Sequence, residues 1–448
     1  MPLPPEAGAI AALQMIRWVR APFSLLADCQ TRFGDAFTLR MPGMPTPIVI
    51  VSDPLAVKDV FALGQDEAHA GKANIVLKPF LGEHSLLLLD GAEHLRQRKM
   101  MLPAFHGERM HAYGRAMLDC ADASIDSWPV GKRFSVHRPM QAITLQVILR
   151  TVFGVEQGAR FVELADVLTR ALDIAAWPGL LFPIVQRDYG RFSPWGRFRR
   201  YAGRASEILR GEIRDGRSNG TKGRSDVLAM MVDARDESGA PLSEDEIHDE
   251  LITLLIAGHE TTATALAWAL RWIVPDRTLT RRLQDEIASA DGDPIRIAKL
   301  ELLDATAKEA LRLQPVIPIV GRLLLEPTTI GRLELPRGVI VAPAIYLVHR
   351  RPGLYPEPDH FNPDRYLAWK PAAWEWIPFG GGLRRCIGAA FAVYEMKMVL
   401  SAIVSRTDLR LASSNVRVVR RGITLTPSGG LPLIAESKRA RRGAQRAA

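Results

Sequence analysis

The feature that most constrains this fold is one unusually long helical pattern, at residues 244–274. Ser243 followed by Glu246 forms a capping box at its start, and Pro275 ends it. At 1.5 Å per residue, about thirty residues make a helix of roughly 45 Å, long enough to cross a whole domain. The remaining elements must therefore pack around a single central helix.

Helical spacing of apolar residues also dominates the rest of the chain. Between Gly, Pro and Asp breaks it predicts helices at 93–102, 107–127, 139–153, 160–174, 201–215, 225–235, 279–290 and 301–313. A loosely helical stretch precedes them at 9–32, and the β-branched run at 35–51 predicts a hairpin. Strand-like pieces follow at 320–326, 339–342 and 416–434. The sequence therefore predicts a mainly α fold with small β-sheets.

Two connecting segments differ sharply in character. Residues 216–225 contain no apolar side chain to bury, which predicts a surface loop. Residues 175–198 are broken by Pro and Gly yet rich in Trp, Phe, Leu and Ile. A loop of that composition usually covers something apolar, whether core, ligand or bilayer.

Composition and charge exclude several classes of protein. With 448 residues, 47% hydrophobic and 24% charged, the chain can bury a large core, so disorder as its overall state is excluded. The net charge is +9, but residues 437–448 hold five basic side chains and no acid. Residues 1–436 therefore carry a net charge of +4, which is modest for their number, so we expect no nucleic-acid partner. We expect one domain at 1–436 and a basic, disordered tail at 437–448.

The cysteines and the N-terminus bear on the compartment. Cys29, Cys120 and Cys386 lie far apart and form no CxxC pair, which excludes a disulfide framework or zinc knuckle and suits a reducing compartment. The apolar run at 7–16 is broken by Arg17. It is too short to span a membrane and lacks a basic leader, so we expect a cytoplasmic protein without a transmembrane anchor.

The centre of the long helix holds an acid and two hydroxyls among apolar residues, at 254–263. One interpretation is purely structural, because Thr261 can bond back to the carbonyl of Ala257 while Glu260 faces solvent. The other is functional, because Gly258 permits close approach to the backbone and the Thr261 hydroxyl can turn toward a ligand. The second interpretation would make a polar notch in an apolar wall.

Two helix-face spacings suggest charged contacts. Glu309 and Arg312 share a face at i, i+3, and Arg365 in the turn FNPDRY could complete a buried cluster, although a surface pair is the ordinary alternative. His94 and Arg98, at i, i+4, place two potential cations on one face. They suit an anionic ligand, unless they simply begin a solvated helix.

The segment 377–395 is the most informative. Its three consecutive glycines match no phosphate-binding motif. What remains is Cys386 at the entrance to an apolar helix, directly after Arg384 and Arg385. Backbone N–H groups, the helix N-terminus and the arginines all favour the thiolate. A nucleophilic cysteine would need a histidine base that no local motif supplies, whereas a lone cysteinate can ligate haem iron.

Four motifs in register then resemble one family. The pattern FxxGxRxCxG at 379–388 resembles the haem-binding signature of the cytochrome P450 family. AGxxT at 257–261 resembles its oxygen-binding groove, ExxR at 309–312 its K-helix pair, and FNPDR at 361–365 the turn that completes the triad. The resemblance covers roughly 35–430 and implies the P450 fold, with haem between the long central helix and the cysteine-loop helix.

The resemblance also implies roles for individual residues. Cys386 would ligate the iron as thiolate, with Phe379 packed over that side and the glycines letting the loop approach the porphyrin. Arg384 would bind a haem propionate, together with other cations at matching positions. The residues implied at the cofactor are His94, Arg98, Ala257, Gly258, Arg322, Phe379, Arg384, Cys386 and Gly388.

Glu260 and Thr261 resemble the family's acid–alcohol pair, which would be catalytic. Cleavage of dioxygen needs protons, and an apolar pocket cannot otherwise supply them. The pair argues against the peroxide-driven branch of the family. Glu309, Arg312 and Arg365 would form a structural triad.

The implied reaction inserts one oxygen atom from O2 into a lipophilic substrate such as a fatty acid, terpenoid, steroid or polyketide. The cofactor would be haem b (iron protoporphyrin IX), with electrons ultimately from NAD(P)H. They would arrive through ferredoxin and ferredoxin reductase, or flavodoxin, since the chain has no flavin or iron–sulfur motif. A basic docking face is expected for that partner. Its members would be Arg96, Lys99, Arg384, Arg385 and Lys397.

The substrate pocket would be formed by mostly apolar segments. These are 70–88, 175–198, 256–262, 316–320 and 426–429. Two rival functions stay open, a haem-thiolate sensor or carrier without turnover and a non-oxygenating haem-thiolate isomerase or dehydratase. A sensor would need the cofactor but neither Glu260 nor Thr261.

Overall fold

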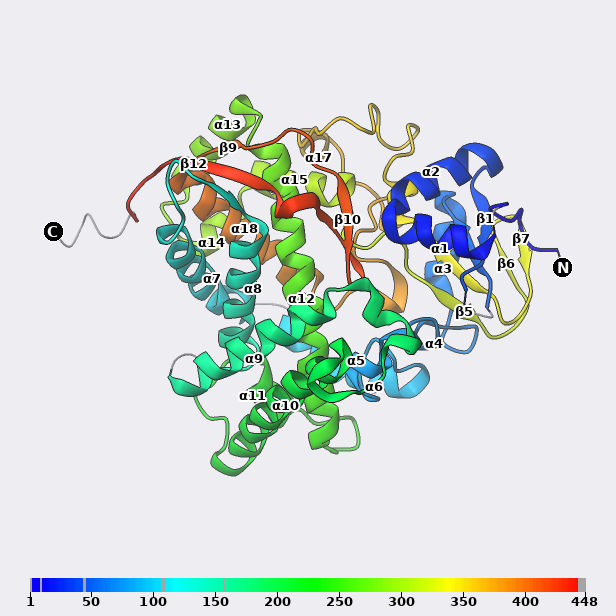
Figure 1. Cartoon of the computed structure of the whole chain (residues 1–448), viewed down its shortest axis with the longest axis horizontal. Coiled ribbons are helices and arrows are strands. Elements are labelled where there is room, and N and C mark those ends of the chain that lie inside the picture. The colour runs from blue at the N-terminus through cyan, green and yellow to red at the C-terminus, as the bar shows by residue number, and fades with distance from the viewer. Residues whose placement is uncertain (1, 9, 43–45, 106–108, 156–157, 442–448) are drawn as a thin grey trace. The chain divides into compact units, whose positions relative to one another are not determined.

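The computed structural model describes all residues except 1, 9, 43–45, 106–108, 156–157 and 442–448. It is mostly helical with small sheets, as predicted (Figure 1). The chain divides into two compact units, each of which is described separately. Unit 1 comprises Met1–Arg96, Leu311–Asn362 and Ala368–Cys386, and unit 2 comprises Gln97–Ala310, Pro363–Leu367 and Ile387–Ala448.

Unit 1 is built on a five-stranded sheet with the order β1-β2-β8-β5-β3. Its strands are β1 (Ala36–Leu39), β2 (Ile48–Val51), β3 (Ala68–His69), β5 (Arg322–Leu324) and β8 (Ile340–Pro343). β1 and β2 pair antiparallel with Ala36 opposite Val51, which confirms the predicted hairpin. β2 runs parallel to β8, and a separate pair of strands, β6 (Thr328–Ile330) and β7 (Leu333–Leu335), forms a second small sheet.

Unit 1 also contains short helices. They are α1 (Ala11–Arg20), α2 (Pro22–Phe33), α3 (Pro54–Ala62), α4 (Ala70–Ala73), η1 (Ile75–Leu77), α5 (Lys78–Leu81), α16 (Ile345–Val348) and η6 (Gly382–Arg384). Of these, α2, α3 and α4 contact strands of the sheet. The carboxylate of Asp53 caps α3 by accepting hydrogen bonds from the amides of Leu55 and Ala56 at 3.0 and 3.2 Å. The sheet side chains are buried in apolar clusters, so the strands form a rigid base for the loops around them.

Unit 2 is organised around α12 (Glu244–Ile273), the long helix of the sequence prediction. The Ser243 hydroxyl accepts from the amide of Glu246 at 3.1 Å, and the Glu246 carboxylate accepts from the amide of Ser243, which confirms the capping box. α12 packs against α8, α10 and α18. Most of its residues are buried, as expected for a helix surrounded by others.

The other helices of unit 2 match most predicted spans within a few residues. They are α7 (Arg109–Asp126), α8 (His137–Thr151), α9 (Ala159–Ala175), α10 (Pro194–Asn219), α11 (Val227–Asp233), α13 (Arg277–Ser289), α14 (Pro294–Ile297), α17 (Arg365–Ala368) and α18 (Ala389–Arg406). α6 (Gly91–Met101), α15 (Glu301–Leu313) and α17 each have residues in both units. Short 3-10 turns occur at η2 (Leu102–Phe105), η3 (Pro178–Leu181), η4 (Pro183–Val185), η5 (Gly190–Phe192) and η7 (Ser428–Gly430).

Two small sheets complete unit 2. One has the order β4-β12-β9, and the other pairs β10 with β11. Their strands are β4 (Arg133–Ser135), β9 (Thr407–Leu411), β10 (Val418–Arg421), β11 (Thr424–Pro427) and β12 (Pro432–Lys438). β12 extends two residues into the segment predicted as a tail. Residues 442–448 of that predicted tail lie outside the described part of the chain.

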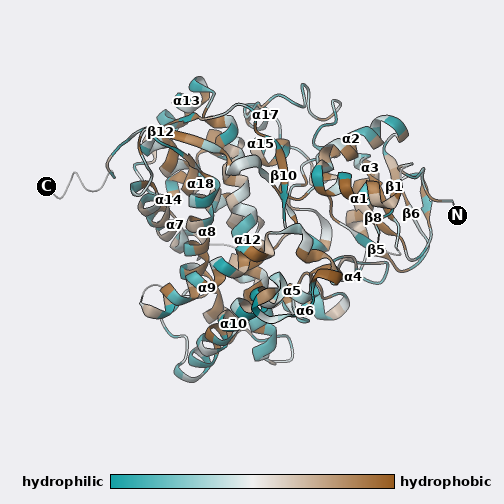
Figure 2. Cartoon of the chain, viewed as in Figure 1, coloured by the Kyte–Doolittle hydropathy of each residue, from teal (hydrophilic) through white to brown (hydrophobic). Residues whose placement is uncertain are grey.

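α10 is longer than the helix predicted at 201–215. The Ser193 hydroxyl caps it by accepting from the amide of Gly196 at 3.0 Å, and Pro194 occupies its first turn. It continues to Asn219, so the prediction of a surface loop at 216–225 is wrong for its first four residues. Its buried residues recur every three to four positions, which explains the mixed hydropathy along α10 in Figure 2. No helix within the described residues is long and apolar enough to cross a membrane.

Candidate functional site

The cysteine loop ends unit 1. Cys386 follows η6, and Gly388 is the N-cap of α18. The amide of Cys386 donates to the carbonyl of Phe379 at 3.0 Å, which closes the loop. The side chain of Cys386 is exposed, whereas Cys29 and Cys120 are buried. Cys386 is therefore the accessible thiol of the three.

The loop glycines are required by contact with α3. At Gly382 the backbone has φ +64°, and a Cβ there would lie 2.0 Å from the carbonyl oxygen of Phe61. A Cβ at Gly381 would lie 2.2 Å from the Phe61 ring. These contacts show that the glycines let the loop lie directly on α3. The approach of the loop to a porphyrin, which the family resemblance implies, stays a prediction.

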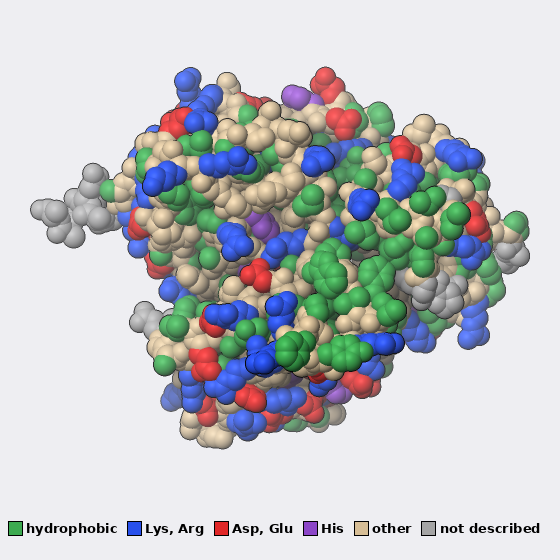
Figure 3. All heavy atoms as spheres, viewed as in Figure 1, with side chains coloured by type: hydrophobic (Ala, Val, Ile, Leu, Met, Phe, Trp, Pro, Cys, Tyr) green, Lys and Arg blue, Asp and Glu red, His purple; other side chains and the backbone are tan. Residues whose placement is uncertain are grey.

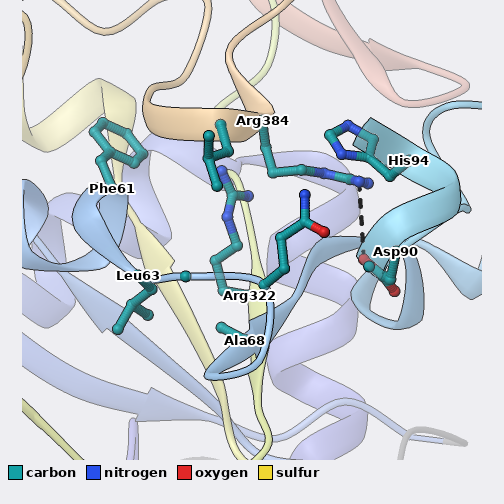
Figure 4. Close-up of a pocket in the computed structure, with 11 residues that line it drawn as sticks. Phe61, Leu63, Ala68, Asp90, His94, Arg322 and Arg384 are labelled. Carbon is teal, nitrogen blue, oxygen red and sulfur yellow. Dashed lines mark ion pairs between the residues drawn. The ribbon is translucent and has the colours of Figure 1, made fainter. Parts of the chain in front are cut away.

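A small cavity next to this loop collects the predicted propionate-binding cations. It measures about 20 Å³, enough for about one water molecule. Arg322, Arg384 and His94 converge on it from a strand, the cysteine loop and α6 (Figure 4). Its full lining is Phe61, Leu63, Gly64, Gln65, Ala68, Asp90, Gly91, His94, Arg322, Leu383 and Arg384.

The cavity is rich in buried positive charge. Arg322 is 8% exposed, and its guanidinium donates to the carbonyls of Gly321 and Gly381 at 2.9 and 3.3 Å. Burial, with a smaller contribution from Arg384, lowers the pKa of Arg322 to about 10, while Asp90 acts in the opposite direction. Two buried guanidinium groups beside one carboxylate favour an anionic ligand, because charge-assisted hydrogen bonds would satisfy them.

The two α6 cations are placed differently. His94 is 2% exposed and lines the cavity, so a fully solvated helix start is excluded for it. Arg98 lies one turn further along α6 and is half-buried. Within the described residues, Arg98 is not one of those that line the cavity. The structure therefore groups His94 with Arg322 and Arg384, and Arg98 stays a prediction.

The middle of α12 carries the predicted acid and alcohol. The Thr261 hydroxyl donates to the carbonyl of Ala257, which is the back-bonded arrangement of the structural interpretation. A Cβ at Gly258 would lie 3.3 Å from the Ile148 side chain on α8, so this glycine allows close helix packing.

Glu260 does not face solvent, because three side chains surround its carboxylate. Its side chain is 17% exposed, and Gln141 donates to Oε2 at 2.8 Å. The Arg421 guanidinium forms an ion pair with Oε1 at 3.2 Å, and His137 Nε2 lies 3.5 Å from the same oxygen. Arg421 also donates to Asp173 at 2.8 Å. The carboxylate is thus tied to α8 and β10.

This environment changes the protonation of Glu260 and His137. Burial raises the pKa of Glu260, and Arg421 and the Gln141 hydrogen bond oppose that rise. Burial lowers the pKa of His137 to about 3, with Arg421 and His259 adding to the effect. His137 is therefore neutral at physiological pH, and Arg421 supplies the positive charge beside Glu260.

The predicted structural cluster is buried. Glu309 and Arg365 form an ion pair at 3.1 Å with side chains 0% and 9% exposed, which excludes a surface pair. Arg312 is 0% exposed and donates to the carbonyls of His349, Pro358 and His360 at 2.7, 2.6 and 3.2 Å. Arg312 therefore organises the loop around 349–360.

The predicted docking face for a redox partner needs one correction. Lys397 is 6% exposed, and its ammonium donates to the carbonyl of Ala298 and to Asp304. It is an internal contact of α18 and cannot belong to a docking face. Arg385 is exposed, and Lys99 is exposed and paired with Glu237. Figure 3 shows lysine and arginine side chains spread over the visible face rather than gathered in one patch.

Several residues of these sites were missed by the sequence analysis. Asp90 was not singled out, although an acid a few residues before His94 and Arg98 is a usable signal. Gln141 and Arg421 carry no local signal, because they meet Glu260 only through helix packing and a distant hairpin.

Comparison with known proteins assigns the family. A family model described as Cytochrome P450 matches residues 2–431. The chain belongs to the cytochrome P450 family. It is 41% identical over 433 residues to a Mycobacterium tuberculosis protein named "Putative cytochrome P450 135B1", covering 96% of this chain and 90% of that protein. A second relative from that organism, named "Putative cytochrome P450 135A1", is 34% identical over 96% of this chain and 94% of its own length.

A solved structure confirms the P450 fold. The structure titled "Retinoic acid bound cyanobacterial CYP120A1" aligns with a TM-score of 0.85 and 24% identity, over 98% of this chain and 100% of that chain. The family places this P450 among haem-thiolate monooxygenases in general. Its own residues fit such a group, since unit 1 combines an exposed cysteine with a cavity of buried cations suited to carboxylates.

Proposed function

We propose that this P450 inserts one oxygen atom from O2 into a lipophilic substrate, using electrons from a separate redox partner. One observation carries the proposal. The loop that presents the exposed thiol of Cys386 also places Arg384 beside Arg322 and His94 at a cavity suited to carboxylates. A thiolate ligand for iron and cationic partners for propionates are what haem b requires. When bound, this cofactor would supply the activation of O2.

Each cofactor-binding residue has a definite task in this proposal. Cys386 donates its thiolate, and Arg322, Arg384, His94 and Arg98 bind the carboxylates of the cofactor. The residues proposed to border the macrocycle are Ala257, Gly258, Phe379 and Gly388. Glu309, Arg312 and Arg365 are proposed to form a structural triad, which the burial of the Glu309–Arg365 ion pair and of Arg312 supports.

Glu260 and Thr261 are proposed to hold and move protons. The Thr261 hydroxyl proton is held by the Ala257 carbonyl and can be released by rotation about χ1. Burial lets Glu260 keep a proton more readily than an exposed glutamate does. Rotation of the Glu260 side chain away from Arg421 and Gln141 would carry that proton toward Thr261. Peroxide-driven chemistry would need neither residue.

We infer the substrate class from the amino-acid composition of the segments predicted to form the pocket. The segments predicted to form the pocket are mostly apolar, which supports a fatty acid, terpenoid, steroid or polyketide. The similar CYP120A1 structure carries retinoic acid, an apolar chain with a carboxylate. Electrons would come from NAD(P)H through ferredoxin and ferredoxin reductase, or flavodoxin. We propose a cytoplasmic location for this reaction.

The first experiment tests the thiolate. The reduced protein gassed with CO should absorb at the red edge of the Soret region, and Cys386→Ser should lose that band while the protein still folds. Persistence of the band in Cys386→Ser, or a native protein that purifies colourless and refuses added haemin, contradicts the proposal.

The second experiment tests turnover. A lipophilic library should give Soret shifts with the ferric protein, and a hit should be converted under labelled O2 to a product that carries one labelled oxygen. An unlabelled product would favour an isomerase or dehydratase. Binding without any product would favour a sensor or carrier.

A further inference from the structure

The inference concerns Asp90, the residue directly before α6. Its side chain is 13% exposed, and both carboxylate oxygens accept backbone hydrogen bonds from another segment. Oδ1 accepts from the amide of Gly71 at 2.8 Å, and Oδ2 accepts from the amide of Lys72 at 3.0 Å. Asp90 thereby fastens the first turn of α4 to the start of α6.

The approach of these two segments is as close as the backbone permits. A Cβ at Gly71 would lie 2.0 Å from the carbonyl oxygen of Leu88 and 2.7 Å from Oδ2 of Asp90. The Leu88 oxygen is backbone and cannot rotate away. Gly71 is therefore needed for Asp90 to reach the α4 amides.

Asp90 also faces the cation-lined cavity. Its Oδ1 lies 3.8 Å from the Arg384 guanidinium, the ion pair drawn in Figure 4, and its Oδ2 lies 3.7 Å from Nδ1 of His69. Arg384 donates to the carbonyl of Leu89 at 2.7 Å and to that of Leu86 at 3.3 Å. Leu86, Leu89 and Asp90, all in the segment that ends at Asp90, therefore contact the Arg384 guanidinium.

We propose that Asp90 is a positioning residue that fastens α4 to the cation cluster and thereby holds Arg384 toward its anionic ligand. Asp90 itself does not bind the ligand, because its charge is of the same sign. Its carboxylate instead compensates part of the positive charge of Arg384 and Arg322. It also holds in place the backbone whose Leu89 carbonyl accepts a hydrogen bond from Arg384. The inference rests on the proposed function, since the ligand is taken to be a haem carboxylate.

Two consequences can be measured separately. Without the Asp90 carboxylate, α4 should open more often, because the amides of Gly71 and Lys72 lose charge-assisted acceptors. The exposed Lys72–Ala73 bond in α4 should then be cut faster by trypsin. Arg384 should also be less well held, so haem should leave faster.

The experiment uses the full chain as purified. Asp90→Asn, Gly71→Ala and the double variant are compared with Asp66→Asn, which removes the same charge from an exposed position in the preceding segment. Haem transfer to an excess of apomyoglobin gives the release rate. Trypsin followed by mass spectrometry gives the rate of cleavage after Lys72, and the circular dichroism spectrum shows that each variant is folded.

We expect Asp90→Asn to raise both rates about tenfold, the effect of losing hydrogen bonds to a charged group. Gly71→Ala should reproduce it, and the double variant should be no worse than the stronger single variant, because both changes break one contact. Asp66→Asn should match the wild type in both assays.

Three outcomes overturn the inference. These are a wild-type rate of cleavage in Asp90→Asn, haem release that stays unchanged while cleavage rises, or equal effects from Asp66→Asn. Failure of the proposed function gives a different pattern, because the wild type would then bind no haem. The cleavage assay on that same protein would still decide whether Asp90 fastens α4.

Discussion

Replacing Arg421 with glutamine tests the account of the buried carboxylate on α12. Arg421 reaches Glu260 from β10, and its guanidinium lies 3.2 Å from Oε1. Burial raises the pKa of Glu260, and among the groups that lower this pKa, Arg421 has the largest effect. Arg421→Gln should therefore leave the Glu260 carboxyl with the hydrogen bond from Gln141 but without the guanidinium that favours its ionised form.

The magnitude can be bounded from the geometry. At 3.2 Å and an effective dielectric constant of about 20, the gross attraction is about 5 kcal/mol. The net value is smaller, because the Arg421 side chain is 29% exposed and shares its charge with Asp173. Breaking fully buried pairs costs about 3–5 kcal/mol, so we expect a loss of about 2 kcal/mol in the free energy of unfolding near neutral pH.

The sign of the pH dependence follows from the raised pKa of Glu260. A folded protein with a raised carboxyl pKa holds the proton more tightly than the unfolded chain does. This contribution to stability is complete below the unfolded value of 4.5 and is lost as pH rises through the folded pKa. Removing Arg421 raises the pKa of Glu260 further, so the variant should be more destabilised at about pH 8 than at about pH 5.

Urea denaturation of four proteins provides the assay. They are the wild type, Arg421→Gln, Glu260→Gln and the double variant, each measured at both pH values. In the Glu260→Gln background the loss of Arg421 should cost much less, giving a coupling energy above about 1 kcal/mol at about pH 8. Asp173→Asn serves as the control for the second contact of Arg421. A coupling energy near zero, or a larger effect of Arg421→Gln at about pH 5, would refute the reasoning.

Two further predictions concern the other buried groups. Arg365→Ala should lower the free energy of unfolding by about 3–5 kcal/mol in urea, because it removes one partner of a buried ion pair and leaves the fully buried Glu309 without that cation. Arg282→Ala should cost less than about 1 kcal/mol, because its ion pair with Asp364 is solvent-exposed. If the two variants lost equal free energy of unfolding, the buried ion pair would stabilise the fold no more than the exposed one. Thr261→Ala should keep binding of substrate but divert reducing equivalents to peroxide, measured as peroxide formed per NAD(P)H consumed. Unchanged coupling would exclude the proposed role of the hydroxyl.

Much of the fold could be predicted because its signals are local. The capping box at Ser243 and the stop at Pro275 set the bounds of α12 almost to the residue. The start of α10 was missed although Ser193 and Pro194 are a standard beginning, because the surrounding glycines and aromatics suggested a loop. β3 pairs only two residues, and its pairing depends on the sheet around it rather than on its own sequence.

Only those site residues that belong to sequence motifs could be predicted. Cys386, Arg384 and His94 were found through their neighbours in sequence, and the last two line one cavity as expected. Lys397 was misplaced because a single lysine on an apolar helix suggests a surface position, whereas here its ammonium is satisfied internally. Arg421 was missed because its contact with the α12 acid joins segments far apart in the chain.

The contact between the cysteine loop and α3 has a practical consequence for engineering. Because Gly381 and Gly382 leave no room for a Cβ against Phe61, the two segments behave as one part of the molecule although they lie at opposite ends of the sequence. A bulkier loop would require a smaller residue and a shifted backbone in α3. Libraries that place larger residues at Gly381 or Gly382 alone should therefore yield mostly unfolded proteins, and paired variation with the end of α3 offers a way to change the cysteine loop.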